Sequence, residues 1–508
     1  MQGNNNIAAQ LAELSNELDL NEKSISIILA AGHGKRIKSE TSKMLHKVWG
    51  VPTVLRVAKA ANEGLQVTNQ IIVVGIKALD VARASGVQKH RVFAWQAEQH
   101  GTGHAVKVAL ELLENKEYEG TIYIFPGDVG LLSKNVVATF REAFDENPSD
   151  MMVLTSYFRG ESKDNYYGRI LRVPEKDAGG KPSGEDQGKV IAIMEHKDIL
   201  SLPEDEPYLV RFNGRTYAFT RQELIDLREF NTGVYAFRAQ PLLEKIHTLS
   251  EDNAQGELYI TDLIAIFNDS GLTVRASATE DEHAVLGFNV KSVLKQMEDI
   301  YRESIYDRLK DIITITDKDD FFIADEVVER ILEMDEKDGP LDIVIGKGVF
   351  IGPNVELSKG VQIGNNAQLE GNIVLGENVN IHQNVNMSTY HDQVMRIGAR
   401  TEIFKGDIIK GDLVIGEDCR IESGVNITGA YEYPVRIGNN VLIKGTSRVF
   451  GCIIDDDIFI EHSVLKFQYV EKTIRKDGTV QPIRWVIPPP QGLDSVHPIE
   501  PGITDRLV

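Results

Sequence analysis

The sequence predicts an α/β protein with a doubly wound, mostly parallel sheet, followed by a left-handed parallel β-helix of hexapeptide repeats. Two patterns support this prediction. Apolar strands alternate with helical stretches between residues 24 and 284, which is typical of crossover connections and of a sheet covered on both faces. Aliphatic residues then recur every six positions between Ile345 and Val449, which is typical of a solenoid made of short strands.

The length and composition agree with this organisation. The chain has 508 residues, of which 42% are hydrophobic and 26% charged, and this is the composition of a globular protein with a sizeable core. At about 150 residues per domain, the length allows roughly three units. We divide the chain into an N-terminal extension (1–23), a first domain (24–290), a connecting helix and linker (291–342), the repeat region (343–465) and a C-terminal hairpin and tail (466–508).

Charge and cysteine content exclude several classes of partner. Acidic residues outnumber basic ones by 76 to 55, for a net charge of −21, which argues against a nucleic-acid partner. No run approaches the roughly 18 apolar residues that a membrane span needs, and residues 1–23 lack the basic start of a signal peptide. Because Cys419 and Cys452 are the only cysteines, a disulfide framework is excluded, and we expect a cytoplasmic protein.

The elements of the first domain can be predicted in order. At the N-terminus, Ile7, Leu11, Leu14 and Leu18 have helical spacing, which predicts a short amphipathic helix that docks on the body or on a partner. Strands are expected at 24–30, 70–76, 121–128, 151–158 and 234–239, and helices at 54–65, 105–116, 135–144 and 291–311. Two polar stretches interrupt the pattern. We expect a surface loop at 174–189 and an ordered insert at 201–230.

The hexapeptide repeat has two interruptions. Its phase slips by four residues at 388–396 and again at 428–436, so each slip predicts a loop projecting from the coil. Gly or Asn is expected to support the corners between strands. Cys419 falls on an inward position, where a small apolar thiol packs well. After about Leu465 the repeat stops, and Asp477-Gly478 predicts a hairpin turn.

The segment 29–48 contains the clearest chemical signal. Gly32 and Gly34 follow the first predicted strand, and the same segment carries the cations Lys35, Arg36, Lys38, Lys43 and Lys47. Glycines in this place let backbone N–H groups approach a phosphate, and nearby cations neutralise its charge. The segment is not a Walker A loop, because it lacks the final Gly-Lys-Ser/Thr, and it is not a dinucleotide fingerprint, because Ile37 stands at the third glycine position.

The same segment resembles the signature of the sugar-phosphate nucleotidyltransferases, LxxGxGxR followed by a lysine. Further segments resemble, in order, the bacterial family of bifunctional N-acetylglucosamine-1-phosphate uridyltransferases. They are WQAEQHGTGHAV (95–106), PGDVGLL (126–132), YGRI (167–170) with MEHKD (194–198), NTGVYAF (231–237), and NAQGELYITDLI (253–264) with LGFN (286–289). The resemblance covers residues 24–290 and extends to the repeat region. It implies a nucleotidyltransferase domain that joins UTP to a sugar-1-phosphate.

The resemblance also implies a role for each matching residue. The nucleotide base and phosphates would be held by Leu29, Ala30, Ala31 and Gly32, and the uracil by Gln96, Gly101 and Thr102. The sugar would contact Gly168, Glu195 and Asn231, and Gly127 would also line the substrate site. Arg36 and Lys43 would be catalytic, and Asp128 and Asn289 would bind Mg²⁺. Independently, Asp128 ends a predicted strand, where parallel sheets place ligands, and oxygen ligands suit a hard cation.

Each of these residues also has a purely structural interpretation. Asp128 could cap a turn, and Arg36 and Lys43 could belong to a solvated basic face. Asn231 could be a turn residue and Glu195 a surface acid, and His46 and His104 are expected to pack locally. The chain also departs from the family at Ser42, Pro126 and Gly130 and in the insert 201–230, which affects the identity of the sugar more than the reaction.

The repeat region lacks the acetyltransferase motif of the resembled family. That motif, Lys-x-x-His-x-x-Tyr, needs a tyrosine three residues after its histidine. The histidines of the repeat region, His382, His391 and His462, are followed at that distance by Val385, Val394 and Leu465. Losing a general base removes about 10²–10⁴-fold of rate. We therefore predict no acetyltransferase activity, and we expect the solenoid to be a homotrimerisation scaffold or a regulatory platform.

Four functions remain open at the level of sequence. The leading hypothesis is a Mg²⁺-dependent uridyltransferase acting on N-acetylglucosamine-1-phosphate. The same reaction on a different hexose-1-phosphate or nucleotide is the second. A bifunctional enzyme with residual acetyltransferase activity and a non-catalytic sugar-nucleotide sensor are the others.

Overall fold

A computed structural model describes residues 2–495, apart from residues 33, 115, 254 and 490, and the side chains of residues 2–5, 35 and 493 are also outside this description. The chain forms two compact units, Met1–Tyr301 and Arg302–Val508. Each unit is described separately below. Within the described residues, none of the helices combines the length and the apolar character that crossing a bilayer requires.

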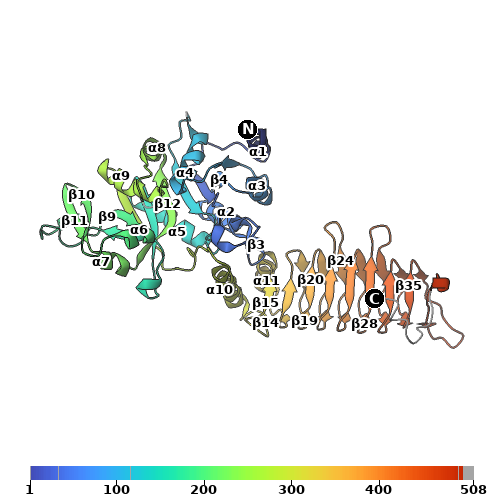
Figure 1. Cartoon of the computed structure of the whole chain (residues 1–508). Coiled ribbons are helices and arrows are strands. Elements are labelled where there is room, and N and C mark those ends of the chain that lie inside the picture. Colours follow the sequence, from blue (N-terminus) through green and yellow to red (C-terminus); the bar gives the residue numbers. More distant parts are fainter. Residues whose placement is uncertain (1, 33, 115, 254, 490, 496–508) are drawn as a thin grey trace, which may run out of the picture. The chain divides into compact units, whose positions relative to one another are not determined.

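The first unit is built on a nine-stranded sheet (Figure 1). The strand order is β13-β7-β12-β6-β1-β4-β5, and β8 and β9 extend it from β12. Neighbouring strands are parallel, except that β12 is antiparallel to β6, β7 and β8, and β8 is antiparallel to β9. The strands are β1 (Ser24–Ala30), β4 (Gln70–Val74), β5 (Arg91–Trp95), β6 (Thr121–Pro126), β7 (Met151–Tyr157), β8 (Arg169–Arg172), β9 (Val190–Met194), β12 (Glu229–Arg238) and β13 (Val274–Ala278). The predicted mostly parallel α/β sheet is confirmed.

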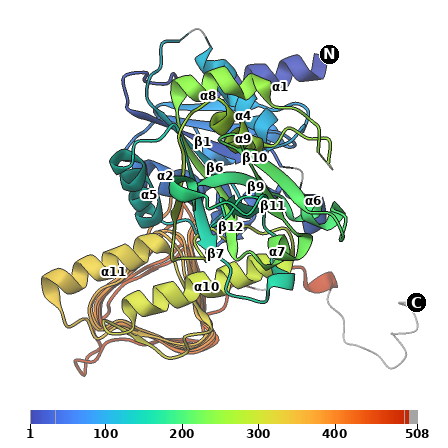
Figure 2. The same ribbon diagram turned by 90° about the vertical axis from the view of Figure 1, so that its left-hand side faces the viewer.

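Helices cover both faces of this sheet (Figure 2). The helices of this unit are α1 (Gln2–Glu13), α2 (Thr53–Leu65), α3 (Ala78–Ser85), α4 (Thr102–Leu110), α5 (Lys134–Glu146), α6 (His196–Ser201), α7 (Arg221–Asp226), α8 (Ala239–Lys245) and α9 (Leu263–Asp269), and α10 (Lys291–Leu309) begins within it. The helices expected from apolar spacing are therefore present. Sequence reasoning did not predict the strands β5, β8, β9 and β13 or the helices α3, α6, α8 and α9.

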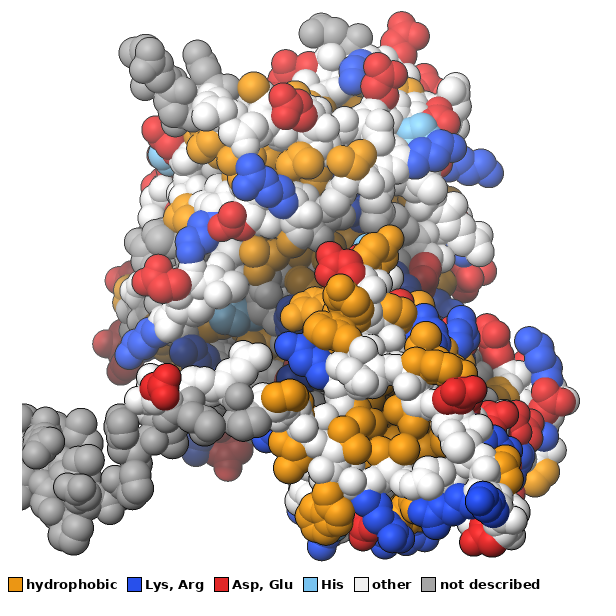
Figure 3. Space-filling view, turned by 90° about the vertical axis from the view of Figure 1, so that its right-hand side faces the viewer, with side chains coloured by type: hydrophobic (Ala, Val, Ile, Leu, Met, Phe, Trp, Pro, Cys, Tyr) orange, Lys and Arg blue, Asp and Glu red, His pale blue; other side chains and the backbone are white. Residues whose placement is uncertain are grey.

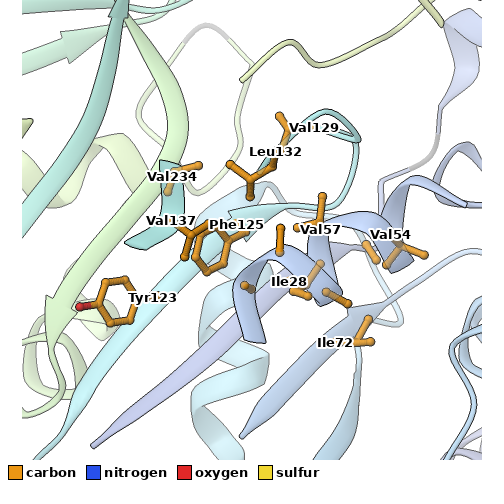
Figure 4. Packing of buried hydrophobic residues seen from close by; sticks show 14 of the residues in the cluster. Ile28, Val54, Val57, Ile72, Tyr123, Phe125, Val129, Leu132, Val137 and Val234 are labelled. Atoms are coloured by element: carbon orange, nitrogen blue, oxygen red, sulfur yellow. The ribbon is translucent and has the colours of Figure 1, made fainter. Parts of the chain in front are cut away.

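Successive residues of a strand belong alternately to two separate hydrophobic clusters, one on each face of the sheet. Ile28 and Ile72 lie in one cluster, whereas Ile27 and Ile71, their neighbours in sequence, lie in the other. This is the consequence of side chains pointing to opposite faces along a strand. Figure 4 shows the first cluster, in which residues of α2 and α5 such as Val57 and Val137 pack against the sheet.

The N-terminal helix α1 docks on the body of the same unit. Leu11 is only 2% exposed, and Ile7 and Leu14 pack against the same hydrophobic cluster. The Arg83 guanidinium of α3 donates a hydrogen bond to the Gln10 side chain at 2.8 Å. Of the two docking partners considered from the sequence, the body is therefore the one used by the apolar face of α1.

The insert 201–230 is ordered, as expected. It forms the hairpin of β10 (Tyr208–Phe212) and β11 (Arg215–Phe219) and then α7, whose N-terminus has a capping box between Thr220 and Glu223. The insert has its own small core, in which Tyr217 and Leu224 are fully buried. This core packs on residues of β8 and β9, so the insert adds a small layer to the edge of the main sheet.

The second unit is a parallel β-helix with three sheets (Figure 1). The first sheet contains β14 (Thr314–Ile315), β16 (Val344–Ile345), β19 (Gln362–Ile363), β22 (Asn380–Ile381), β25 (Glu402–Ile403), β28 (Arg420–Ile421), β31 (Leu442–Ile443), β34 (Phe459–Glu461) and β37 (Ile483–Arg484). The second contains β15 (Phe321–Ile323), β17 (Val349–Ile351), β20 (Gln368–Glu370), β23 (Asn386–Ser388), β26 (Ile408–Gly411), β29 (Asn426–Gly429), β32 (Arg448–Phe450) and β35 (Val464–Lys466). The third contains β18 (Val355–Glu356), β21 (Ile373–Leu375), β24 (Met395–Ile397), β27 (Leu413–Ile415), β30 (Val435–Ile437), β33 (Ile453–Ile454) and β36 (Tyr469–Val470).

The sheets extend beyond the repeat that the sequence shows. β14 and β15 begin the stack before residue 343, and β36 and β37 continue it after residue 465. The helix α11 (Asp325–Asp338) lies between β15 and β16 in the chain. The helix α11 separates β14 and β15 from the repeat, and residues 471–482 separate β37 from β36, so the six-residue spacing is interrupted at both ends and sequence reasoning missed these end coils.

The strand pairing within one sheet shows that a coil has three sides of six residues each. Ile345 pairs with Ile363 and Ile363 with Ile381, so equivalent positions recur after 18 residues. Ile381 then pairs with Ile403, which is 22 residues on. The four extra residues belong to the first predicted loop, and Figure 1 shows loops projecting from the coil beside β24. Tyr390 and Tyr431, one in each loop, are both more than three-quarters exposed.

The corners and the interior of the coil match the expectations from the sequence. Asn366 and Asn384, at equivalent corners, have positive φ angles of 58° and 59°, a conformation that Asn tolerates better than most residues. Cys419 is 2% exposed, and burial raises the pKa of its thiol. In Figure 3, exposed apolar side chains gather on the solenoid, and the last coils contribute Phe467, Tyr469, Trp485 and Ile487.

Candidate active site

The candidate site lies at the carboxyl ends of two neighbouring parallel strands, β1 and β6. Their register brings Leu29 beside Pro126, and the Gly127 N–H donates to the Leu29 carbonyl at 3.0 Å. A Cβ on Gly127 would lie 2.9 Å from that same carbonyl oxygen, so only glycine allows the two strand ends to approach this closely. Asp128 follows directly, and it is held at the carboxyl edge where parallel sheets bind ligands.

The glycine-rich loop after β1 folds back on Lys43. Gly34 has a φ angle of 61° and precedes a short 3₁₀ turn, Lys35–Ile37. A Cβ on Gly34 would lie 2.8 Å from the Lys43 Cβ, so a side chain at this position would collide with the lysine. The predicted catalytic residue Arg36 is exposed on this turn.

Three predicted residues from distant parts of the sequence meet at one point. The Lys43 ammonium group donates to the Asp128 carboxylate at 2.5 Å and to the Asn289 side-chain oxygen at 3.0 Å. Lys43 is only 8% exposed, and the Phe288 ring centroid is 5.3 Å from its ammonium nitrogen. A buried lysine needs such partners, because an uncompensated buried charge is very costly.

The same two oxygens fit a divalent cation. Asp128 and Asn289 direct their oxygens to a single position, which the Lys43 ammonium occupies. Mg²⁺ prefers oxygen ligands and often takes only one or two from the protein, with phosphates and water as the others. Within the described residues there is no group of three or more His, Cys, Asp or Glu side chains that could hold a metal by itself. The donor set therefore suits a metal that arrives with a phosphate.

The predicted uracil residues line a loop that is fixed by a second chain segment. The Gly103 N–H donates to the Leu258 carbonyl at 2.8 Å, and the Leu258 N–H donates to the His100 carbonyl at 2.8 Å. Gly101 has a φ angle of 99°, and a Cβ there would lie 2.6 Å from the Leu258 oxygen. Thr102 starts α4, and its hydroxyl accepts a hydrogen bond from the Ile260 N–H at 3.3 Å.

Gln96 faces this loop from the end of β5. Its side chain is 3% exposed and donates to the Gly101 carbonyl at 3.2 Å. The His104 Nδ1 is 3.1 Å from the Gln96 side-chain nitrogen, and burial lowers the pKa of His104. His46 also packs locally, with its ring edge-on to Phe288. Both histidines are therefore part of the packing around the site, as expected.

The predicted sugar residues are neighbours as well. The Asn231 N–H donates to the Gly168 carbonyl at 2.9 Å, and a Cβ on Gly168 would lie 3.1 Å from a Glu195 carboxyl oxygen. The pairing of β12 with β7 is irregular between Asn231 and Tyr235. This irregularity allows the Tyr235 hydroxyl to donate to the Asn231 side chain at 3.0 Å.

Glu195 has an unusual electrostatic environment. Burial, followed by the nearby carboxylates of Asp198 and Asp262, raises the pKa of Glu195 to about 7. Burial and Asp198 also raise the pKa of Asp262 to about 6. Near neutral pH, Glu195 can therefore be either a proton donor or an acceptor. Strongly shifted carboxyls in a pocket are candidates for substrate contact.

A single cavity of about 400 Å³ joins these groups. Of the predicted residues, it is lined by Leu29, Ala31, Gly32, Gln96, Gly101, Thr102, Asp128, Glu195 and Asn231. Ala30, Arg36, Lys43, Gly127, Gly168 and Asn289 are not among its lining residues. Lys43, Gly127 and Gly168 instead contact residues that do line it, and Asn289 contacts Lys43. Ala30 is buried in β1 and points away, and the exposed Arg36 is the one predicted catalytic residue for which no such contact is described.

Sequence reasoning missed about half of the cavity wall. The additional lining residues are Met44, Gln99, Ala105, Pro126, Gly233, Tyr235, Glu257, Ile260 and Thr261. Met44 and Pro126 adjoin a predicted residue, and the others lie in the segments 95–106, 231–237 and 253–264 that carry the family resemblance. Residues 231 and 235 share a face in any regular strand, but the register shift between them, where four residues of β12 oppose two of β7, could not be predicted.

The solenoid histidines show a different arrangement. The His382 ring stacks on Phe404 with centroids 4.4 Å apart and an interplanar angle of 13°. The His462 Nδ1 is 2.9 Å from the Gly445 carbonyl oxygen and from the Thr446 hydroxyl. His391 is exposed in the first projecting loop, where its carbonyl accepts from the Asn372 side chain. Two of the three side chains are thus used in contacts between successive coils.

Comparison with known proteins identifies both regions at a coarse level. Residues 26–256 match the MobA-like NTP transferase domain, and residues 342–377 match the hexapeptide repeat of succinyl-transferase. The bifunctional protein GlmU of Clostridium tetani is 36% identical over 304 residues, which are 60% of this chain and 58% of that protein. The GlmU of Acetivibrio thermocellus is 32% identical over 305 residues, 60% of this chain and 57% of that protein.

The alignments therefore span less than three-fifths of the length of these curated relatives. Among solved structures, a nucleoside-diphosphate-sugar pyrophosphorylase from Vibrio cholerae is 18% identical and covers 54% of this chain and 99% of its own, with a TM-score of 0.37. Within the first unit, residues 26–256 are thus similar to the MobA-like NTP transferase domain, and within the second, residues 342–377 are similar to a hexapeptide repeat.

Proposed function

We propose that the first unit transfers the uridylyl group of UTP to a sugar-1-phosphate, most plainly N-acetylglucosamine-1-phosphate, with Mg²⁺ as the cofactor. The observation that carries this proposal is the convergence of Lys43, Asp128 and Asn289 beside a cavity lined by Leu29 and Gly32. The motifs between residues 24 and 290 that resemble N-acetylglucosamine-1-phosphate uridyltransferases favour a uridylyl transfer over other nucleotidyl transfers.

The reaction follows from this geometry. An oxygen of the sugar-1-phosphate attacks the α-phosphorus of UTP, and the bond from that phosphorus to the bridging oxygen of the β-phosphate breaks. Pyrophosphate leaves with the bonding electron pair. The nucleophile is already an anion at neutral pH, so the protein need not remove a proton from it. Positioning and cationic stabilisation are then the main requirements.

The residues of this chain supply those requirements. Bound Mg²⁺ would neutralise charge on the phosphates, and Asp128 and Asn289 would hold it. The Lys43 ammonium group donates to the same two oxygens, so it would give up this position to a bound Mg²⁺ and would then lie next to the phosphates that the metal brings. Arg36, on the exposed 3₁₀ turn, is the further cation that we propose for the triphosphate.

The cavity also supports the two specificity roles. Gln96 is buried beside the loop that Gly101 and Thr102 start, and it offers an amide group to a base edge. Glu195 and Asn231 line the other part of the cavity, where they offer a carboxyl and an amide to sugar hydroxyls. No described residue of the insert 201–230 lines this cavity, so the insert provides no direct argument for a different sugar.

A panel of substrates tests the proposal. Pyrophosphate release would be measured with Mg²⁺, UTP and several sugar-1-phosphates, using the full chain. Release with N-acetylglucosamine-1-phosphate is the expected result. Release only with another sugar or nucleotide would replace the substrate and keep the reaction. Binding of UTP without release from any sugar phosphate would favour the sensor function instead.

For the second unit we propose a scaffold that assembles three copies of the chain. Exposed apolar side chains gather on the solenoid, and its described histidines 382 and 462 are used in coil contacts. Light scattering of the full chain tests this, with the mass of a trimer as the expected result. A monomer at micromolar concentration would contradict it.

A further inference from the structure

A second cavity in the first unit lies apart from the candidate active site. Its volume is about 580 Å³, which exceeds the 400 Å³ of the active-site cavity. The two cavities share no lining residue. The second cavity runs along β13, the strand at the edge of the main sheet, and reaches residues of α5, β8 and α9. Its volume is in the range of small-molecule sites.

Two segments without a role in the proposed reaction meet at this cavity. The polar loop 174–189 contributes Gln187, Gly188 and Lys189, and the insert hairpin contributes Phe212 and Asn213. Asp186 joins the two segments. Its carboxylate accepts from the Asn213 side chain at 3.0 Å and from the Lys189 ammonium at 2.7 Å. Hydrogen bonds therefore join the two insertions where they form the wall of the cavity.

The charged groups of this cavity have one sign. Its lining contains Arg172, Lys189 and Arg275 but no Asp or Glu, although acidic residues outnumber basic ones in the chain by 76 to 55. Two of the cations have partners outside the lining. Arg172 forms two 2.7 Å hydrogen bonds with the buried carboxylate of Glu229, and Lys189 pairs with Asp186.

These partners hold the cationic side chains in place, but some N–H groups of the two arginines remain without a described acceptor. Arg172 donates from Nε and Nη2 to Glu229 and from Nη1 to the Gly188 carbonyl, which are three of its five N–H groups. For Arg275, the described hydrogen bond goes from Nε to the Pro148 carbonyl at 3.4 Å, and this leaves the Nη groups available. A fixed guanidinium with spare donors loses little entropy when it binds an anion.

We propose that this cavity binds a small phosphorylated molecule through Arg172, Lys189 and Arg275. Phosphate oxygens are strong acceptors, and Arg recognises them with two parallel N–H groups. The lining also offers the side chains of Asn147, Asn268 and Thr273, which suit the hydroxyl groups of a phosphorylated metabolite. The site is separate from the proposed uridylyl transfer and does not depend on it.

Inorganic phosphate is the probe for this site, titrated into the full chain by calorimetry. The double variant Lys189→Gln/Arg275→Gln removes two of the three cations, and both residues are exposed, so the fold should persist. Loss of two charge-assisted hydrogen bonds should weaken binding by about tenfold or more. Arg172 is kept, because its removal would leave Glu229 buried without its partner.

Two controls separate this site from others. The variant Lys176→Gln/Lys181→Gln removes the same charge from exposed positions of the same loop that do not line the cavity, and its affinity should equal that of the wild type. Arg36→Ala alters the proposed active site and should also keep the affinity. The proposal is overturned if the wild type binds no phosphate, if Lys189→Gln/Arg275→Gln binds it equally well, or if only Arg36→Ala loses it.

Discussion

Polar side chains at the carboxyl edge of the sheet surround a cavity, whereas equivalent groups in the solenoid are used in packing. Lys43, Asp128 and Asn289 meet from positions far apart in the sequence, and their donors and acceptors lie beside open space. His382 instead stacks on Phe404 of the next coil, and Asp407 is fully buried. A sheet edge ends in loops that can take irregular shapes, while a coil repeats its contacts at each turn.

Chemistry is therefore expected in the first unit and not in the solenoid. In the first unit, positive-φ glycines let backbone segments approach each other around the cavity, as Gly101 does against Leu258. In the solenoid, positive-φ residues such as Asn366 occur at corners and serve the regular winding. The predictions below test this difference, beginning with the largest expected effect.

Asp128→Asn should reduce pyrophosphate release by about 10³-fold or more, because both the metal ligand and the partner of Lys43 are altered. Steady-state kinetics with UTP and N-acetylglucosamine-1-phosphate would measure this. Asp145→Asn, an exposed change on α5, serves as the control. Comparable rates for wild type and Asp128→Asn would refute the assignment of the site.

Gly101→Ala should lower kcat/KM for UTP by about 10²-fold, because the new Cβ pushes the uracil loop away from Leu258. The matched control is Gly406→Ala in the solenoid. Both glycines have positive φ, but a Cβ on Gly406 meets nothing within 4 Å. The control should therefore cost only about 1–2 kcal/mol of stability and leave kinetics unchanged. Equal kinetic losses in the two variants would mean that strain, and not the clash, is responsible.

Asp407→Asn should change how the stability of the solenoid depends on pH. Burial raises the pKa of Asp407 from 3.8 to about 8 in the folded chain. The folded state therefore holds a proton that the unfolded state has lost between these pH values, and stability decreases as pH rises towards 8. The variant should lose this dependence and be more stable than the wild type at pH 9 by about 1 kcal/mol or more. Denaturant melts at several pH values would measure it, and parallel curves for the two proteins would contradict the prediction.

Glu195→Gln should have the smallest effect, a change of less than about tenfold in KM for the sugar phosphate. Because the pKa of Glu195 is raised to about 7, its carboxylate forms as pH rises through 7, and affinity for sugar hydroxyls should then increase. The variant should lack this rise in a plot of KM against pH. A wild-type KM that is constant between pH 6 and 8 would show that Glu195 does not contact the sugar.

Much of the fold could be predicted because its signals are periodic. Strand and helix spacing predicted the first sheet, and the four-residue slips predicted both projecting loops. The site was predicted through residues that match a known family, and the meeting of Lys43 with Asp128 and Asn289 agrees with that resemblance. Residues such as Tyr235 and Ile260 could not be found, because their place on the cavity wall depends on an irregular strand and a long-range loop contact.

The second cavity shows another limit of sequence reasoning. The loop 174–189 and the insert 201–230 were recognised only as departures from a pattern. Their meeting through Asp186 depends on a hydrogen bond between Asp186 and Asn213, which are 27 residues apart. Nothing in the spacing of these residues indicates it, because neither segment is periodic.

The most direct test of the central claim is a paired assay on one preparation of the full chain. One reaction contains Mg²⁺, UTP and N-acetylglucosamine-1-phosphate, and the other contains acetyl-CoA and glucosamine-1-phosphate. We predict pyrophosphate release in the first and no acetyl transfer in the second. Acetyl transfer without pyrophosphate release would contradict the account, because it would place the chemistry in the solenoid and not at the edge of the sheet.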